Sequence, residues 1–352
     1  MAGGIGSRFW PMSRTNYPKQ FLDILGTGES LLQQTFKRLS NVCPEENILI
    51  VTNEQYKDLV QEQLPAINES QVLCEPARRN TAPCIAYAAY KVKALNPNAV
   101  MLVAPSDHLI TDEKGFVETA KEALENASMQ NILVTLGIEP SRPDTGYGYI
   151  QYLSDTLGSS KLHKVKTFTE KPNLELANQF LDSGDFLWNS GIFIWSVESI
   201  MKAMEELMPE TQANFEELSA FINTDQEQEQ LNRIYPTCKN ISIDYGIMEK
   251  AENVYVIPSS FGWSDLGTWG SLYEHKDHDE QGNALQGKNV LVYNSSGNIV
   301  NASSDKLVVL QGIEDCIVVE KDNVILICKK EQEQEIKQIV NNVKIEKGNG
   351  YV

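Results

Sequence analysis

The sequence has little of what a membrane protein or a nucleic-acid-binding protein needs. Its apolar runs are far shorter than the roughly 20 residues that a membrane-spanning helix requires, and its amino terminus lacks the charged and then apolar pattern of a secretion signal. Basic residues are also scarce. There are 30 Lys and Arg against 48 Asp and Glu, and the net charge of −18 repels nucleic-acid phosphates. We therefore expect a cytoplasmic protein that binds neither membranes nor nucleic acids.

Patterns typical of zinc sites, disulfides and P-loop chemistry are missing as well. The six cysteines form no Cys-x-x-Cys pair and have no group of histidines nearby, so we expect buried free thiols. No Gly-Lys-Ser/Thr closes the glycine run at the amino terminus, which argues against a P-loop ATPase. His108 follows Asp107, but a lone histidine at a strand end is more often structural than catalytic, and we assign it no chemistry.

The amino-terminal glycine loop is the most informative stretch that is present. Closely spaced glycines let the backbone turn tightly and bring N–H groups against phosphate oxygens, and the cations that follow can neutralise the phosphate charge. Phe9 stands where a dinucleotide-binding fingerprint would need its third glycine, so a nucleoside triphosphate fits better. The candidate phosphate-binding residues are Gly3, Gly4, Gly6, Ser7, Arg8 and Lys19.

Most of the chain alternates between short apolar runs and helical patterns. Continuous apolar runs are typical of strands that are buried on both faces of a parallel sheet. The alternation predicts an α/β, doubly wound, Rossmann-like architecture with a mixed, mainly parallel sheet. Ligands of such sheets bind beyond the carboxyl ends of the strands, where Asp107 lies. The predicted strands are 47–51, 99–104 and 131–136, and the predicted helices are 81–95 and 116–127.

The pattern changes near residue 283. Short β-prone runs separated by Gly, Asn, Asp and Ser turns predict a small all-β domain that an amphipathic helix closes. We therefore divide the chain into a catalytic domain, 1–282, and a carboxyl-terminal domain, 283–352. The strands expected in the second domain are 289–293, 306–310, 316–319 and 323–327, and the expected helix is 331–343.

At the glycine loop and in seven ordered blocks, the chain resembles the sugar-1-phosphate nucleotidyltransferases, and within them the mannose-1-phosphate guanylyltransferases. The resemblance covers most of the chain, and it implies that the carboxyl-terminal domain is β-helix-like and helps to form a homodimer. The seven blocks are 75–83, 105–108, 145–150, 170–172, 188–191, 244–250 and 263–267.

The resemblance implies transfer of GMP from GTP to mannose 1-phosphate, with release of pyrophosphate. The implied cofactor is Mg²⁺, held by Asp107 and Asp265, because Mg²⁺ takes one or two protein carboxylates and fills its other positions with water and phosphate oxygens. The implied catalytic residues are Arg8, Lys19, Asp107, Lys171 and Asp265. The implied substrate-binding residues are Gly3, Gly4, Gly6, Ser7, Glu75, Asn80, Thr81, Gly146, Glu170 and Asn189.

Several of these assignments have a structural alternative in the sequence itself. Asp265 fits an Asx turn or a helix cap, Asn80 or Thr81 fits the cap of the following helix, and Glu170 with Lys171 fits an exposed ion pair. At the level of function, the alternatives are the same chemistry on another sugar 1-phosphate or nucleotide, and a non-catalytic nucleotide-binding relative.

The ends of the chain give two further expectations. In the resembled family the glycine loop follows a short apolar strand at the centre of the sheet, whereas here Met1 stands directly before Ala2 and Gly3. We expect the native product to carry a short apolar segment upstream. We also expect it to lack the additional isomerase domain of some relatives, because the chain ends soon after the small β domain.

Overall fold

The structure is a computed structural model that describes residues 1–303 and 305–352. The chain divides into two compact units. The larger unit consists of Met1–Gly3, Phe36–Ser106 and Ile110–Trp263, and the smaller unit of Gly4–Thr35, Asp107–Leu109 and Ser264–Val352. A boundary between the units falls within each of α1 (Leu31–Leu39), β4 (Leu109–Ile110) and β10 (Trp263–Ser264).

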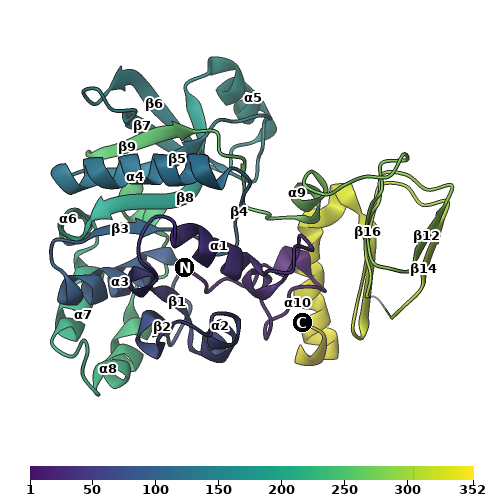
Figure 1. Cartoon of the computed structure of the whole chain (residues 1–352), viewed down its shortest axis with the longest axis horizontal. Helices are drawn as coiled ribbons and strands as arrows, with labels where there is room; N and C mark the ends of the chain where they lie inside the picture. The colour runs from purple at the N-terminus through teal and green to yellow at the C-terminus, as the bar shows by residue number, and fades with distance from the viewer. Residues whose placement is uncertain (304) are drawn as a thin grey trace. The chain divides into compact units, whose positions relative to one another are not determined.

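The larger unit is an α/β layer structure (Figure 1). Its strands are β1 (Ile50–Asn53), β2 (Val72–Glu75), β3 (Val100–Val103), β5 (Leu133–Ile138), β6 (Gly148–Thr156), β7 (His163–Glu170), β8 (Phe186–Ser196) and β9 (Val254–Ser259). Its helices are α2 (Lys57–Gln63), α3 (Thr81–Leu95), α4 (Glu113–Met129), α5 (Leu174–Ser183), α6 (Val197–Leu207), α7 (Pro209–Ser219) and α8 (Glu227–Ile234).

Six of these strands form one sheet in the order β3-β8-β5-β9-β7-β6. Strand β8 runs antiparallel to β3, β5 and β6, and β7 runs antiparallel to β9 and β6, whereas β5 and β9 are parallel. It follows that β3, β5, β9 and β6 share one direction. The mixed sheet predicted from the sequence is therefore present, but the expectation that it is mainly parallel is wrong, because β5 and β9 are the one parallel pair among its described neighbouring strands and the other pairs are antiparallel. Strands β1 and β2 form a separate parallel pair.

Helices cover both faces of this sheet, as the doubly wound prediction requires. On β8, Phe193 and Trp195 belong to a core that includes residues of α3 and α6, while Ile192 and Ile194 belong to a second core with residues of α4. Side chains alternate between the faces of a strand, so the two cores lie on opposite faces. Figure 1 shows α4 lying along the sheet.

Helix α3 has the bounds that the sequence predicts, 81–95. The side chain of Asn80 accepts a hydrogen bond from the backbone N–H of Thr81, which satisfies one of the donors left over at the helix start. The helix stops at Asn96, directly before Pro97, because a proline disfavours helical geometry in the residue before it. Local sequence therefore defines both ends of α3.

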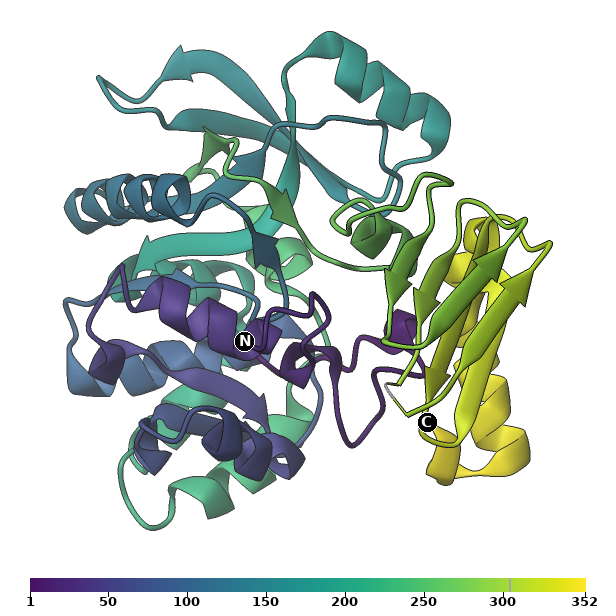
Figure 2. The same cartoon turned by 45° about the vertical axis from the view of Figure 1, so that its right-hand side comes forward.

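The smaller unit contains the β-helix-like part of the chain (Figure 2). Strands β11, β13 and β15 stack in parallel, and β12 stacks in parallel on β14, while β16 closes the first stack antiparallel to β15. The elements are α9 (Trp269–Tyr273), β11 (Ala284–Gln286), β12 (Val290–Tyr293), β13 (Ile299–Asn301), β14 (Val308–Gln311), β15 (Cys316–Lys321), β16 (Val324–Lys329) and α10 (Ile336–Lys347).

Successive coils of this domain are joined by side chains as well as by strands. Val300, Leu310 and Val318 pack together in a small core of the domain. The Asn298 amide donates to Asn283 Oδ1 at 2.9 Å and accepts from the Cys316 N–H at 3.0 Å, which continues the stacking through a turn. Helix α10 begins later than predicted, because residues Lys330–Glu335 form a 3₁₀ segment before it.

Across the described residues, no helix combines the length and the apolar character that crossing a bilayer demands. The six cysteines are free thiols, and four of them are buried.

Candidate active site

The glycine loop of the smaller unit folds around Lys19. Gly6 has a φ of +69° and starts a short 3₁₀ turn, Ser7–Phe9, and this left-handed conformation favours glycine. A Cβ atom on Gly6 would collide with the Lys19 side chain. The Lys19 N–H donates to the carbonyl of Ile5 at 3.1 Å, so the loop and the lysine hold one another. Gly6 is therefore required both for its conformation and for the space that it leaves.

Lys19 connects the two aspartates that the sequence analysis singled out. Its Nζ lies 3.0 Å from Asp107 Oδ2 and donates to the backbone carbonyl of Asp265 at 2.6 Å. The Lys19 side chain is 4% exposed, whereas the Asp107 side chain is 31% exposed. Burial by itself would raise the pKa of Asp107, but the Lys19 ammonium and His108 outweigh burial and hold the pKa below its ordinary value. Asp107 is therefore ionised at neutral pH.

Asp107 and Asp265 are the residues that could hold a hard divalent cation, although Lys19 contacts Asp265 through its backbone carbonyl and not through its carboxylate. Asp107 contributes an ionised, partly exposed carboxylate, and Asp265 directs one carboxylate oxygen, Oδ1, to the Gly267 N–H at 2.8 Å. In the part of the chain that the structure describes, no group of three or more His, Cys, Asp or Glu residues could hold a metal. A two-carboxylate set is nevertheless enough for Mg²⁺, which usually keeps waters and takes phosphate oxygens as its other ligands.

The remaining residues of the glycine loop differ in what surrounds them. Arg8 donates through Nε to Gln334 Oε1 at 2.8 Å, so a residue of the 3₁₀ segment before α10 holds its guanidinium. Ser7 lies in the same short turn as Arg8. Gly4 is exposed, and a Cβ there would meet nothing within 4 Å, so packing does not explain why Gly4 is a glycine.

In the larger unit, Glu75 ends β2 as a buried carboxyl group. It is 7% exposed, and it accepts a short hydrogen bond from the Tyr235 hydroxyl. Burial raises the pKa of Glu75 to about 7, and Tyr235 offsets only part of that effect. Gly3 lies beside it, because a Cβ on Gly3 would lie 3.1 Å from Glu75 Oε2.

Asn80 and Thr81 both make structural hydrogen bonds at the start of α3. Asn80 has a φ of +65° and its side chain caps the helix, while Thr81 Oγ1 accepts from the Ile243 N–H at 2.9 Å. The helix-capping alternative raised by the sequence is therefore present in the structure. Asn80 is also exposed, so its cap bond leaves part of the amide facing solvent.

A second group of polar residues surrounds Gly148 in the larger unit. A Cβ on Gly148 would lie 2.6 Å from Glu170 Oε2 and 3.5 Å from Asn189 Cβ, so the two side chains meet over this glycine. Lys171 Nζ lies 2.8 Å from Glu170 Oε1, and Asn189 donates to Asp244 Oδ1 at 2.7 Å. Glu170 therefore lies beside both Lys171 and Asn189 in this group.

Lys171 and Gly146 have unusual backbone surroundings in this group. Lys171 has a φ of +48°, a left-handed conformation that a lysine adopts rarely, and its side chain is 59% exposed. Strained conformations of this kind often occur at functional sites. Gly146 donates its N–H to Asp144 Oδ1 at 2.8 Å, and a Cβ there would lie 3.1 Å from the same oxygen.

Comparison with known proteins identifies the family to which this chain belongs. A family model described as nucleotidyl transferase matches residues 1–282, and one described as MannoseP isomerase/GMP-like beta-helix domain matches residues 287–343. A mannose-1-phosphate guanylyltransferase of Salmonella montevideo is 38% identical, over 98% of this chain and 73% of its own length. The chain belongs to the mannose-1-phosphate guanylyltransferase family.

Other family members match over similar lengths. The alginate biosynthesis protein AlgA of Pseudomonas aeruginosa is 37% identical, over 97% of this chain and 71% of its own length. A crystal structure from Thermus thermophilus, described as mannose-1-phosphate geranyltransferase, is 30% identical and superposes with a TM-score of 0.86 over 98% of each chain. The α/β fold with a β-helix-like domain is thereby confirmed for this member of the family.

The structure also assigns contacts to residues to which the sequence analysis gave no role. Asp244 begins a π-helical turn, Asp244–Met248, and orients Asn189. Its own pKa is raised by burial, with a further contribution from Glu170. Asp244 stands in one of the seven family blocks, which was the available signal. The sequence carries no such signal for Tyr235 or Gln334, because each makes its hydrogen bond with a residue that is far away along the chain.

Proposed function

We propose that this chain transfers GMP from GTP to mannose 1-phosphate, which gives GDP-mannose and pyrophosphate. The observation that carries the proposal is the contact of Lys19 with both Asp107 and Asp265 behind a tight glycine turn. This contact brings a buried cation and two acidic residues together behind the loop. A triphosphate needs the cation and the backbone N–H groups of the loop, and its metal needs the acidic residues. Membership of the mannose-1-phosphate guanylyltransferase family supports the choice of substrates.

The chemistry needs positioning and charge more than it needs a base. The phosphate of mannose 1-phosphate is already ionised at neutral pH, so its oxygen attacks the α-phosphorus of GTP in line without prior deprotonation, and pyrophosphate leaves. Arg8 stabilises the departing β and γ phosphates, Lys19 the α-phosphate and Lys171 the attacking phosphate. Preorganised cations of this kind account for a large share of the rate in reactions that move charge between oxygens.

We propose Mg²⁺ as the divalent metal, with Asp107 and Asp265 as its protein ligands. When bound, the metal would supply positive charge to phosphate oxygens that gain charge during the reaction. Lys19 keeps Asp107 ionised before any metal arrives, and Gly267 holds one oxygen of Asp265. The ionised, partly exposed Asp107 carboxylate supports this assignment more directly than any other feature of the two residues.

Substrate selection is proposed to use residues of the larger unit. The segment from Glu75 to Ala82 would read guanine, through Glu75, nearby backbone groups and the exposed part of Asn80. Glu170 and Asn189 would bind sugar hydroxyls, and Gly146 would let the sugar approach the backbone. The buried contact of Glu75 with Tyr235 supports a positioning role for that carboxyl, next to the segment that would face the base.

Pyrophosphate release measured for each pairing of GTP, ATP, UTP and dTTP with mannose 1-phosphate and glucose 1-phosphate tests this proposal. We expect GTP with mannose 1-phosphate to give the fastest release. Release with dTTP and glucose 1-phosphate, but none with GTP and mannose 1-phosphate, would contradict the guanylyl assignment. No release from any pair, with nucleotide still bound, would identify a non-catalytic relative.

We further propose a cytoplasmic homodimer, in which residues 1–282 form the catalytic domain and 283–352 the dimerising domain. Leu291 and Val309 lie opposite one another on β12 and β14 and are 46% and 53% exposed, and Ile325 and Ile327 on β16 are also exposed. Exposed apolar side chains in such number are typical of an interface. Sedimentation at micromolar concentration should give a dimer for the parent chain and a monomer for Val309→Glu, and a parent chain that sediments as a monomer would contradict the proposal.

A further inference from the structure

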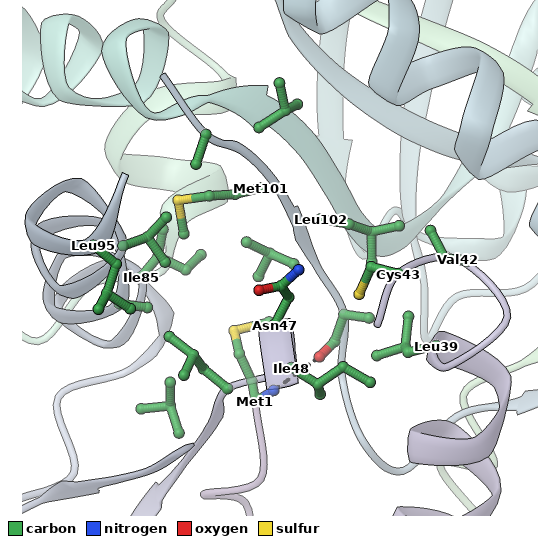
Figure 3. A pocket seen from close by; sticks show the side chains of 18 of the residues that line it. Met1, Leu39, Val42, Cys43, Asn47, Ile48, Ile85, Leu95, Met101 and Leu102 are labelled. Atoms are coloured by element: carbon green, nitrogen blue, oxygen red, sulfur yellow. Dashed lines mark hydrogen bonds between the residues drawn. The ribbon is translucent and has the colours of Figure 1, made fainter. Parts of the chain in front are cut away.

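The larger unit contains a cavity of about 430 Å³ whose walls are mainly apolar. Figure 3 shows Ile85, Leu95 and Leu102 among the side chains that line it. Among the described residues that line this cavity, none belongs to the polar group around Gly148. A phosphate needs cations and hydrogen-bond donors, so this cavity does not serve the proposed sugar-phosphate site. The residues that support that site are found instead in the loop between β5 and β6.

Asp144 holds the backbone of this loop where it leads into Gly148. Its Oδ1 accepts from the Gly146 N–H at 2.8 Å. Its backbone carbonyl accepts from the hydroxyl of Tyr149, a fully buried residue of β6, at 3.0 Å. Asp144 is therefore fixed to the sheet through Tyr149, and its carboxylate in turn fixes the backbone at Gly146.

Arg142 holds the other oxygen of the Asp144 carboxylate. Its Nε and Nη2 donate to Asp144 Oδ2 at 3.1 and 2.8 Å. The side chains of Arg142 and Asp144 are 36% and 21% exposed. A guanidinium that donates two hydrogen bonds to a partly buried carboxylate restricts the position of that carboxylate more than a single exposed ion pair does. The orientation of Asp144 toward Gly146 therefore depends on Arg142.

The Arg142 guanidinium also packs against two buried aromatic rings. Its Cζ lies 5.9 Å from the centre of the Tyr147 ring and 5.3 Å from the centre of the Trp188 ring. The centres of these two rings are 5.0 Å apart. Cations are attracted to the faces of aromatic rings at such distances. Tyr147 directly precedes Gly148, and Trp188 directly precedes Asn189, so Arg142 contacts the neighbours of two residues in the polar group.

The backbone of Tyr147 connects this loop to Lys171. Its carbonyl accepts from the Lys171 N–H at 3.3 Å, and Gly148 lies opposite Glu170 in the pairing of β6 with β7. Lys171 has a φ of +48°, a conformation that persists only where the surroundings enforce it. A change in the backbone at Tyr147 would therefore be transmitted to Lys171.

We propose that Arg142 is a positioning residue of the sugar-phosphate site. Through Asp144 it holds the backbone at Gly146, and through Tyr147 it holds the backbone of Lys171, without contacting the substrate itself. This inference rests on the proposed function, because it takes the polar group around Gly148 as the site for the sugar phosphate.

Arg142→Ala, Arg142→Lys, Asp144→Asn and the double variant Arg142→Ala/Asp144→Asn test the proposal. One readout is the KM for the sugar 1-phosphate against the KM for the nucleotide. The other is amide hydrogen exchange of peptides that contain residues 144–149 and Lys171, followed by mass spectrometry, which needs no substrate. Arg233→Ala is the matched control, because Arg233 forms an exposed ion pair with Glu217 in the same unit.

Arg142→Ala should raise the KM for mannose 1-phosphate about tenfold, with little change in the KM for GTP, because the charged hydrogen bonds that position the loop are lost. Hydrogen exchange of the two peptides should become faster in the same variant. Arg142→Lys should resemble Arg142→Ala, since an ammonium group provides neither the planar fork nor the stacking surface of a guanidinium. The double variant should be no worse than Arg142→Ala, because both substitutions remove one interaction.

A normal KM for mannose 1-phosphate in Arg142→Lys would overturn the proposal, because charge alone would then suffice. Unchanged hydrogen exchange in Arg142→Ala, additive effects in the double variant, or an equal rise in both KM values would also overturn it. A failure of the guanylyl assignment is seen separately, in the parent chain. If the parent chain turns over another sugar 1-phosphate, the KM for that sugar phosphate becomes the readout, and a parent chain that turns over none would overturn both proposals.

Discussion

Replacing Glu75 by Gln should remove a pH dependence of stability that the buried carboxyl imposes. Burial raises the pKa of Glu75 from its ordinary value of 4.5 to about 7 in the folded chain. A pKa that is raised on folding stabilises the protein below the unfolded value, and this stabilisation is lost as the pH rises through the folded value. Each pKa unit corresponds to about 1.4 kcal/mol. The shift of Glu75 therefore lowers the free energy of unfolding by about 2 kcal/mol between about pH 5.5 and about pH 8.5.

Urea denaturation of the parent chain and of Glu75→Gln at these two pH values measures the effect. Gln keeps an oxygen that can accept from Tyr235, so the variant should fold. Its free energy of unfolding should change by about 2 kcal/mol less between the two pH values than that of the parent chain. Glu62→Gln, at an exposed position of α2, is the matched control and should behave as the parent does. The same pH dependence in the parent chain and in Glu75→Gln would refute the reasoning.

Two further predictions concern the candidate site. Asp107→Asn and Asp265→Asn should each lower kcat by about 100-fold or more while Tm stays within a few degrees, because each removes a carboxylate that would hold the metal, and the metal would neutralise charge at the transferring phosphate. Asp225→Asn is the control, and normal turnover at limiting Mg²⁺ would disprove a metal role. Lys171→Ala should raise the KM for mannose 1-phosphate about tenfold with little change in the KM for GTP, as expected for loss of a charged hydrogen bond. The control Lys166→Ala should change neither KM, and a larger effect of Lys171→Ala on the KM for GTP would contradict the assignment of Lys171 to the sugar phosphate.

Much of the fold could be predicted from local pattern. Helix α3 has the predicted bounds because its start has a capping residue and its end precedes a proline. The predicted strands near 50, 101 and 134 are present because continuous apolar runs are typical of buried strands. Helix α10 starts later than predicted, since an amphipathic pattern does not distinguish a 3₁₀ segment from the α-helix that follows it.

The candidate site could be predicted only in part. The glycine loop and the acidic residues were visible as motifs, and the structure joins Lys19 to Asp107 and Asp265. Pattern alone could not give the φ of +48° at Lys171 or the hydrogen bond from Arg8 to Gln334, because both depend on contacts between segments far apart along the chain. The burial of Glu75 against Tyr235 is of the same kind.

Isotope transfer from the sugar phosphate tests the central claim most directly. Mannose 1-phosphate labelled with heavy oxygen in the terminal oxygens of its phosphate is turned over with GTP, and both products are analysed by mass spectrometry. If the sugar phosphate attacks the α-phosphorus of GTP, all of the label is retained in GDP-mannose, including the oxygen that bridges the two phosphorus atoms, and none enters pyrophosphate. Label in pyrophosphate, or an unlabelled bridging oxygen in GDP-mannose, would contradict the account.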